Sequence, residues 1–169
     1  MASVMSRGGA LALAIGIGAA VASGGALAHV HDKMPANANA ATKAAYARHE
    51  NFEKLGAAFK GLNDELRKGS PNKTVVAANA KTMNTLVGAL PTWFPRGSGV
   101  EARPLSEAKA GIWTDAAGFA TAATAARTEV AKLNAAAAAG DLDAVKAQVR
   151  PTGGACKGCH DKYRQEKKD

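Results

Sequence analysis

The chain has 169 residues, of which 47% are hydrophobic and 5% aromatic, and it carries a formal net charge of +8. This length favours a single domain. Its lysines and arginines are dispersed and do not alternate with aromatic residues along a basic stripe, which argues against nucleic-acid binding. We interpret the positive charge as a solvated surface that steers anionic redox partners.

Residues 1–28 have the organisation of a cleaved secretory signal peptide. Arg7 provides a positive charge, residues 10–21 form a weakly apolar run, and Ala26-Leu27-Ala28 is a small-x-small cleavage site. An uncleaved membrane anchor is the alternative, because Arg7 is the only charged residue of this segment. We expect cleavage after Ala28, which leaves residues 29–169 as a mature domain in a bacterial periplasm.

The mature chain then begins with His29-Val30-His31. A free amine followed by a histidine at the third position can wrap Cu(II) or Ni(II) through amine, amide and imidazole nitrogens. A frayed terminus without a ligand is the other interpretation. We hypothesise that this terminus binds copper in vitro if cleavage falls after Ala28.

Three longer stretches show apolar residues at steps of three and four, the spacing of a helix with one buried face. The first stripe contains Ala41, Ala45, Arg48, Phe52, Leu55, Phe59, Leu62 and Leu66, the second Val76, Ala80, Met83, Val87 and Leu90, and the third Ile112, Ala116, Phe119, Ala123, Ala126, Val130 and Leu133. The heptad-like spacing of the third stripe suits nearly antiparallel bundle packing.

Turn and cap residues predict the ends of the first three helices. Ser70 and Pro71 have the character of an N-cap and a first helical residue for the second helix, and Pro91 stops that helix. Ser106 is the predicted N-cap of the third helix. Trp93, in the loop between the two, is too apolar to be fully solvated, as is its neighbour Phe94.

The last part of the chain predicts two further helical segments. Gly140 ends the third helix, and Asp141 caps a short helix over residues 142–149. Pro151 interrupts it, and Thr152 restarts a helix that runs to about Lys167. Four amphipathic helices with short connections predict an all-α, antiparallel four-helix bundle.

Cys156-Lys157-Gly158-Cys159-His160 has the Cys-x-x-Cys-His pattern of covalent c-type haem attachment. On a helix, residues three and four apart share one face, so both thiols can reach the vinyl groups of one porphyrin while His160 becomes the axial ligand of the iron. The chain contains only these two cysteines, so no further cysteine remains to form a structural disulfide with either of them. We therefore expect one covalently bound haem c between the helix faces.

Two other uses of this pattern remain open from the residues alone. A Cys-x-x-Cys pair can be a redox dithiol, but such motifs usually follow a strand at the start of a helix. It can also be half of a zinc site, which needs two more ligands, and only His160 is close in sequence.

Four segments of the chain carry a resemblance to the class II c-type cytochromes, the cytochrome c prime family. They are Cys156-x-x-Cys159-His160-x-x-Tyr163-Arg164, the Leu90-Pro91 turn leading to Trp93, Ile112-Trp113-Thr114-Asp115, and Ala139-Gly140-Asp141-Leu142. The resemblance covers nearly all of the mature chain. It implies a left-handed four-helix bundle, often a homodimer, with the haem near one end.

The resemblance also assigns roles to individual residues. Phe52 takes the distal position over the haem, where a methionine would ligate the iron and an apolar residue leaves it five-coordinate. Arg48 pairs with a haem propionate, and Arg164 lies on the proximal face. Trp113 and Trp93 pack around the haem edge. Without the resemblance, Phe52 is an ordinary core residue whose burial contributes roughly 1.5–3 kcal/mol, and both arginines are solvated helix residues.

The function implied by this resemblance is a periplasmic haem protein with high-spin, five-coordinate iron. It would bind nitric oxide or carbon monoxide, exchange electrons with redox partner proteins, and have no catalytic residues. The alternative is a low-spin electron carrier whose sixth ligand is Met83, Met34 or His49. A peroxide-reactive enzyme is a third interpretation, in which only His49 could serve as an acid or base.

Overall fold

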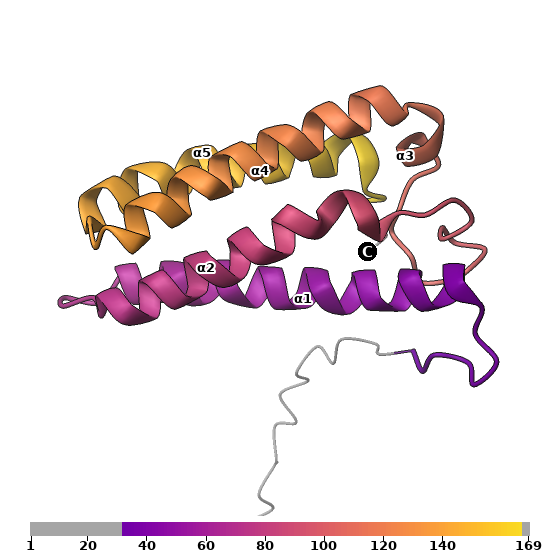
Figure 1. Ribbon diagram of the computed structural model, residues 1–169, viewed down its shortest axis with the longest axis horizontal. Helices are drawn as coiled ribbons and strands as arrows, with labels where there is room; N and C mark the ends of the chain where they lie inside the picture. Colours follow the sequence, from indigo (N-terminus) through magenta and orange to yellow (C-terminus); the bar gives the residue numbers. More distant parts are fainter. Residues whose placement is uncertain (1–31, 167–169) are drawn as a thin grey trace, which may run out of the picture. The chain divides into compact units, whose positions relative to one another are not determined.

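The computed structural model describes residues 32–166, and they form a four-helix bundle (Figure 1). The four long helices are α1 (Ala40–Leu66), α2 (Lys73–Ala89), α4 (Ala116–Ala138) and α5 (Leu142–Tyr163). A short 3-10 helix, η1 (Leu90–Trp93), and the single turn α3 (Gly111–Thr114) lie in the link between α2 and α4. Residues 32–166 contain no β-strand beyond one isolated bridge between Ala108 and Arg164. The predicted all-α, antiparallel bundle is confirmed.

The predicted signal peptide and His29-Val30-His31 lie outside the described residues. Within the described part of the chain, none of the helices combines the length and the apolar character that a membrane span requires.

The predicted apolar stripes form the core of the bundle. One cluster of buried side chains joins α1, α2, α4 and α5. At its centre Leu62, Val76, Met83 and Leu133 are at most 1% exposed. Each such side chain contributes about 1.5–3 kcal/mol through its burial, so the stripes hold the helices together along their length.

The starts of the second and third long helices differ from the prediction. α2 begins after Asn72, whose side-chain oxygen accepts hydrogen bonds from the backbone N–H groups of Thr74 and Val75. Ser70 lies in the exposed link before it. An asparagine oxygen that satisfies two N–H groups at the start of a helix is as good a cap as a serine, and Asn72 therefore displaces the predicted boundary by two residues.

The third long helix begins at Ala116 and not after Ser106. Asp115 is its N-cap and accepts a hydrogen bond from the N–H of Gly118 at 3.1 Å. The Ser106 hydroxyl instead accepts a hydrogen bond from Arg48 at 3.1 Å. Ile112, expected on the same helix as Phe119, lies in the separate turn α3 and is still buried.

Helix α5 runs without interruption through Pro151, although a break was predicted there. A proline inside a helix removes one hydrogen bond of the ladder and its ring crowds the carbonyl four residues earlier, which disfavours a continuous helix without forbidding it. The next residue, Thr152, is fully buried and donates its hydroxyl to the carbonyl of Gln148 at 2.9 Å. The helix ends at Tyr163, before the predicted end near Lys167.

The turn between α4 and α5 agrees with the prediction. Gly140 has a positive φ of 69°, and its N–H donates to the carbonyl of Ala137. The N–H of Asp141 donates to the carbonyl of Ala136, and the Asp141 side chain then caps α5 by accepting from Ala144. This is the Schellman arrangement, in which a glycine at the left-handed position ends one helix.

Three of the four pairs of neighbouring helices in the bundle pack closely, and the fourth pair does not. α1 packs closely on α2, α2 on α4, and α4 on α5, whereas α1 and α5 meet at few positions. At one of these positions the Phe52 ring lies 6.4 Å from the His160 ring. At another, a Cβ built on Gly153 would lie 3.8 Å from Phe59. The two meeting points are seven residues apart on both helices, as antiparallel packing requires.

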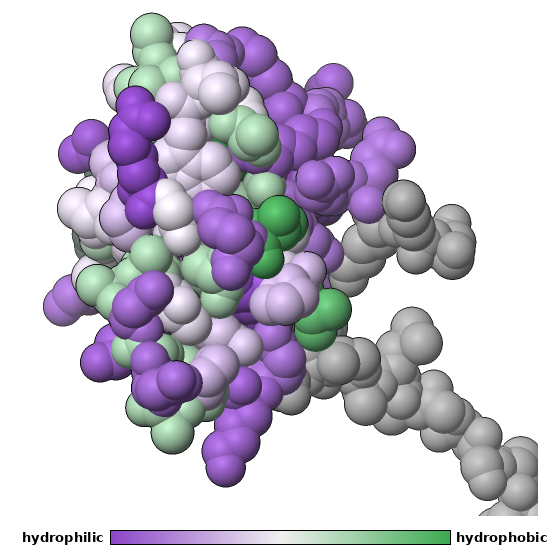
Figure 2. Space-filling view, turned by 90° about the vertical axis from the view of Figure 1, so that its right-hand side faces the viewer, coloured by the Kyte–Doolittle hydropathy of each residue, from purple (hydrophilic) through white to green (hydrophobic). Residues whose placement is uncertain are grey.

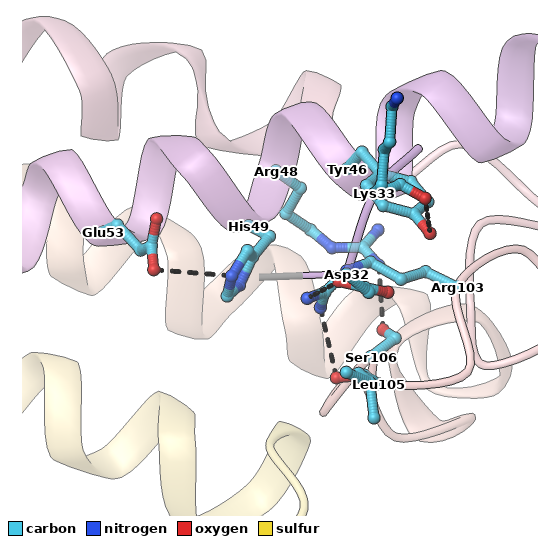
Figure 3. Close-up of polar contacts among 9 residues, drawn as sticks. All are labelled: Asp32, Lys33, Tyr46, Arg48, His49, Glu53, Arg103, Leu105 and Ser106. Atoms are coloured by element: carbon cyan, nitrogen blue, oxygen red, sulfur yellow. Dashed lines mark hydrogen bonds and ion pairs between the residues drawn. The ribbon is translucent and has the colours of Figure 1, made fainter. Parts of the chain in front are cut away.

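The segment before α1 is tied to the link between α2 and α4. Arg103, only 3% exposed, donates to the carboxylate of Asp32 at 2.9 Å, and the guanidinium lies 5.4 Å from the ring of Tyr46 (Figure 3). Figure 2 shows the end of the molecule where this link lies: hydrophilic residues predominate there, and strongly apolar side chains form separate spots. The exposed large hydrophobic residues of the described chain are Met34, Val75, Val100 and Leu105.

Candidate functional site

The three residues of the Cys-x-x-Cys-His motif lie on the last turns of α5. Cys156 and Cys159 are half-buried and do not form a disulfide. Burial raises the pKa of both thiols, and the neighbouring Cys156 raises that of Cys159 further. Both are therefore protonated thiols at neutral pH. Among residues 32–166 there is no group of three or more histidine, cysteine or acidic residues that could hold a metal ion.

The imidazole of His160 is neutral at neutral pH. Burial lowers its pKa, and the positive charge of Arg164 lowers it further, against the opposing effect of Asp161 and Glu107. A neutral imidazole has a ring nitrogen whose lone pair can bind iron. The donor set on α5 thus fits a c-type haem: two thiols for the vinyl groups and one imidazole for the metal.

An aromatic cluster surrounds this end of α5. Its buried members include Trp93, Phe119 and Tyr163, and Phe52 and Cys159 pack against them. The Phe52 ring meets Trp93 edge to face, with centroids 5.2 Å apart and planes at 88°. Apolar walls beside two thiols and an imidazole suit a flat, largely apolar macrocycle.

Phe52 lies opposite His160 across the side of the bundle where α1 and α5 meet. Their ring centroids are 6.4 Å apart. The ring planes are inclined at 69°, so the two side chains meet edge to face. Phe52, which the resemblance assigns to the distal position, therefore lies beside the imidazole of the haem motif.

Arg48 is buried, at 4% exposure, and both terminal nitrogens of its guanidinium have protein partners. One nitrogen donates to the carbonyl of Trp93 at 3.2 Å and to the hydroxyl of Ser98 at 2.9 Å; the other donates to the carbonyl of Ser98 at 2.6 Å and to the hydroxyl of Ser106 at 3.1 Å. Burial lowers the pKa of Arg48 to about 10, and the nearby Arg103 adds to the shift. Arg48 is therefore charged at neutral pH.

The other predicted pocket residues lie around the same end of the bundle. Trp113 donates its indole N–H to the carbonyls of Phe94 at 3.0 Å and Pro95 at 3.2 Å. Arg164 is exposed at the end of α5, with its Nε 3.9 Å from a carboxylate oxygen of Glu107. A cavity of about 350 Å³ adjoins it, lined by Lys157, His160, Asp161, Arg164, Gln165 and Glu166.

The three candidates for a sixth iron ligand lie in different surroundings. Met83 is 1% exposed in the central core, a cluster that does not include Cys159. Met34 is 43% exposed in the segment before α1. His49 is half-buried on α1, with its Nε2 3.4 Å from a carboxylate oxygen of Glu53 (Figure 3).

Two features of the site were not predicted from the sequence. Asp115 accepts hydrogen bonds from the Tyr163 hydroxyl at 2.8 Å and from Lys162 at 2.7 Å, and so ties α4 to the end of the helix that carries His160. Ser98, fully buried, is the main partner of Arg48. Tyr163 lies in the haem motif and could have been singled out, whereas nothing in the local sequence distinguishes Ser98.

Comparison with known protein families and with known proteins points to one family. A family model described as cytochrome c′ matches residues 43–164. The chain is 45% identical over 92 residues to cytochrome c′ of Rubrivivax gelatinosus, covering 54% of this chain and 70% of that protein. It is 30% identical over 118 residues to cytochrome c′ of Pararhodospirillum photometricum, covering 70% and 93% of the two chains.

Solved structures show the same fold. The crystal structure of cytochrome c′ from Rubrivivax gelatinosus superposes with a TM-score of 0.66 at 35% identity, covering 74% of this chain and 97% of that one. A ferrous variant of cytochrome c prime from Alcaligenes xylosoxidans with bound NO gives a TM-score of 0.67 at 29% identity, with 75% and 97% coverage. A carbon monoxide-bound variant of that protein gives 0.68 at 28% identity, with 76% and 99% coverage. With the helical bundle, the Cys-x-x-Cys-His motif and the family match over residues 43–164, the chain belongs to the cytochrome c′ family.

Proposed function

We propose that this protein is an exported, periplasmic haem c protein that binds small diatomic gases and exchanges electrons with partner proteins. Cys156 and Cys159 would hold one haem covalently, and His160 would ligate its iron. The bound haem would supply a metal that can bind nitric oxide or carbon monoxide and, separately, can gain or lose one electron in exchange with a partner protein. The NO-bound and CO-bound structures of the relative from Alcaligenes xylosoxidans support the gas ligands.

The observation that carries this proposal is the position of Phe52. Its ring lies beside that of His160, with the centroids 6.4 Å apart, and a haem ligated by His160 would separate the two rings, with Phe52 on its other face. A phenyl ring has no lone pair, so it cannot donate to iron. It can exclude water and bulky ligands from the open face while it packs on Trp93. We infer a five-coordinate iron with Phe52 as the gate on its distal side, and assign no acid or base to catalysis.

The surroundings of the three alternative ligands also support an open site. Met83 is enclosed by the central core, where its loss would leave a cavity. Met34 precedes α1, and His49 has Glu53 as its partner. A low-spin electron carrier requires one of these side chains to leave its surroundings and reach the iron.

The absorption spectrum of the purified holoprotein tests the proposal. We expect broad, high-spin ferrous bands that sharpen when carbon monoxide is added, because the position opposite His160 is open. The variant Phe52→Met should move the iron towards low spin, since the thioether sulfur can donate where the phenyl ring cannot.

The opposite result is equally clear. A sharp, split ferrous spectrum that does not respond to carbon monoxide would show that a side chain already fills the sixth position. The variants Met83→Leu, Met34→Leu and His49→Gln would then identify that ligand. An unchanged spectrum of Phe52→Met, in a protein that does bind carbon monoxide, would place another residue of α1 over the iron.

A further inference from the structure

Arg48 holds the polypeptide segment that packs against Phe52. Its four hydrogen bonds go to Trp93, Ser98 and Ser106, which are 45 to 58 residues further along the chain. Its guanidinium carbon also lies 4.7 Å from the centroid of the Phe94 ring. Two terminal nitrogens carry four N–H groups, so these four bonds use all of them.

Two aromatic rings of this segment contact Phe52. The ring of Trp93 lies 5.2 Å from that of Phe52, and the ring of Phe94 lies 6.3 Å away, both edge to face. From the other side, Trp113 donates to the carbonyls of Phe94 and Pro95. The backbone of residues 93–95 is therefore fixed between Arg48 and Trp113, and Phe52 rests against its two rings.

Burial of the guanidinium makes this arrangement rigid. A buried charge is tolerated only while its hydrogen bonds are satisfied. Movement of residues 93–98 away from α1 would leave Arg48 in the interior with only the Ser106 hydroxyl of its four present acceptors. The nearby Arg103 gives no relief, because it is a second cation, itself 3% exposed and paired with Asp32 (Figure 3). Displacement of residues 93–98 from Phe52 is thus coupled to loss of the Arg48 hydrogen bonds to Trp93 and Ser98.

We propose that Arg48 is a positioning residue for the distal gate: through Trp93 and Phe94 it holds the Phe52 ring over the open face of the haem and so limits how fast a small ligand reaches the iron. This role rests on the proposed function, and it differs from the propionate contact that the family resemblance implies for Arg48. It acts on access to the iron and leaves the haem attachment on α5 unchanged.

A double-mutant cycle on carbon monoxide association to the ferrous holoprotein tests the proposal. Arg48→Gln should accelerate association about tenfold, because the free energy of one hydrogen bond to a charged group corresponds to about that factor in rate. Phe52→Ala should accelerate it at least as much. In the Phe52→Ala background, Arg48→Gln should have no further effect, because the group it positions is gone.

Two variants control for unfolding and for charge. Ser98→Ala removes one acceptor and leaves the arginine in place, so it should accelerate association in the same direction but less. Arg127→Gln removes an exposed arginine of α4 and should change nothing. A second readout does not depend on the kinetics: NMR of the ferrous carbon monoxide complex, which is low-spin and diamagnetic, should show faster ring flips of Phe52 in Arg48→Gln.

Two results would overturn the proposal. If Arg48→Gln accelerated association equally with and without Phe52, or shifted the reduction potential without changing the rate, then Arg48 would act on the haem itself, as a propionate partner does. If the ring flips of Phe52 were unchanged, the segment would not be holding the gate. Failure of the wild type to bind carbon monoxide because a side chain fills the sixth position would refute the proposed function instead. The ferrous iron would then be low-spin and diamagnetic without added ligand, and the NMR comparison on that state would still decide whether Arg48 positions Phe52.

Discussion

Asp115 joins the two helices that meet beside the haem motif. One carboxylate oxygen accepts from the N–H of Gly118 and caps α4, and the other accepts from the hydroxyl of Tyr163 and from Lys162. The hydrogen bond from Lys162 contributes most to lowering the pKa of Asp115, to about 2, followed by those from Tyr163 and Gly118. Since Tyr163 is three residues after His160, this contact fixes the last turn of the haem-carrying helix.

Gly118 leaves the space that this contact occupies. A Cβ built there would lie 2.5 Å from the hydroxyl oxygen of Tyr163 and 2.7 Å from Oδ1 of Asp115, closer than real Cβ atoms come to other atoms. We expect Gly118→Ala to lower the free energy of unfolding by about 1–3 kcal/mol, as overpacking does. Thermal unfolding followed by circular dichroism measures the change.

Gly88→Ala is the matched control for that variant. Gly88 is also a helical glycine, but it is exposed, and a Cβ there would meet nothing within 4 Å. An alanine in place of a helical glycine stabilises by about 0.5–1 kcal/mol. Equal melting temperatures for the two variants would show that the contact between Asp115 and Tyr163 yields easily and does not constrain α5.

The start of α5 depends on a single cap. Asp141 accepts a hydrogen bond from the N–H of Ala144 at 2.9 Å, directly after Gly140 has ended α4. We expect Asp141→Ala to cost about 1 kcal/mol of unfolding free energy, measured by chemical denaturation. Asp143→Ala, two residues later on an exposed side chain, should cost only a few tenths of a kcal/mol. A loss as large in Asp143→Ala would show that negative charge near the helix start, and not the cap, stabilises α5.

The helices were predictable wherever local chemistry decides. The stripes through Val76 and Leu133, the glycine at 140 and the cap at 141 all depend on neighbours within one or two turns. The errors at Ser106 and Pro151 have non-local causes. Ser106 is used by Arg48, 58 residues earlier, and α5 continues past Pro151 in a segment that also packs on α4, where Thr152 reaches the carbonyl of Glu129.

In the candidate site, too, the residues set by local sequence could be predicted and those set by distant contacts could not. The Cys-x-x-Cys-His motif could be named from its spacing, and the resemblance proposes Phe52 as the distal residue, because each occupies a set position on one helix. The partners of Arg48 could not be predicted, since Ser98 and Ser106 come from an irregular link whose path depends on the packed structure. A sequence pattern shows that a buried arginine needs acceptors, but it does not show which segment supplies them.

Over the whole molecule, acidic groups with lowered pKa values make stability depend on pH. In four of them the largest cause is a hydrogen bond donated by a lysine: Asp64 from Lys60, Glu65 from Lys68, Asp115 from Lys162 and Glu129 from Lys132. A carboxylate whose pKa is lower in the folded state stabilises the fold above its unfolded pKa, and that contribution is lost as the pH falls through the folded pKa. These groups are on α1, on α4 and at the end of α3, so the effect is spread over the bundle.

We therefore expect these groups to stabilise the holoprotein fully above about pH 4.5. Their contribution should fall as the pH drops to about 2, where half of the Asp115 carboxylate is protonated. The positive net charge grows over the same range, and its self-repulsion adds to the loss. Denaturation midpoints at pH 7, 4 and 2.5 measure the slope.

Asp115→Asn should be less stable than wild type at pH 7, and the difference should shrink towards pH 2, because the wild-type carboxylate is then losing its charge. A constant difference between the two proteins across this range would mean that the Tyr163 and Lys162 contacts stabilise the end of α5 by shape and not by charge.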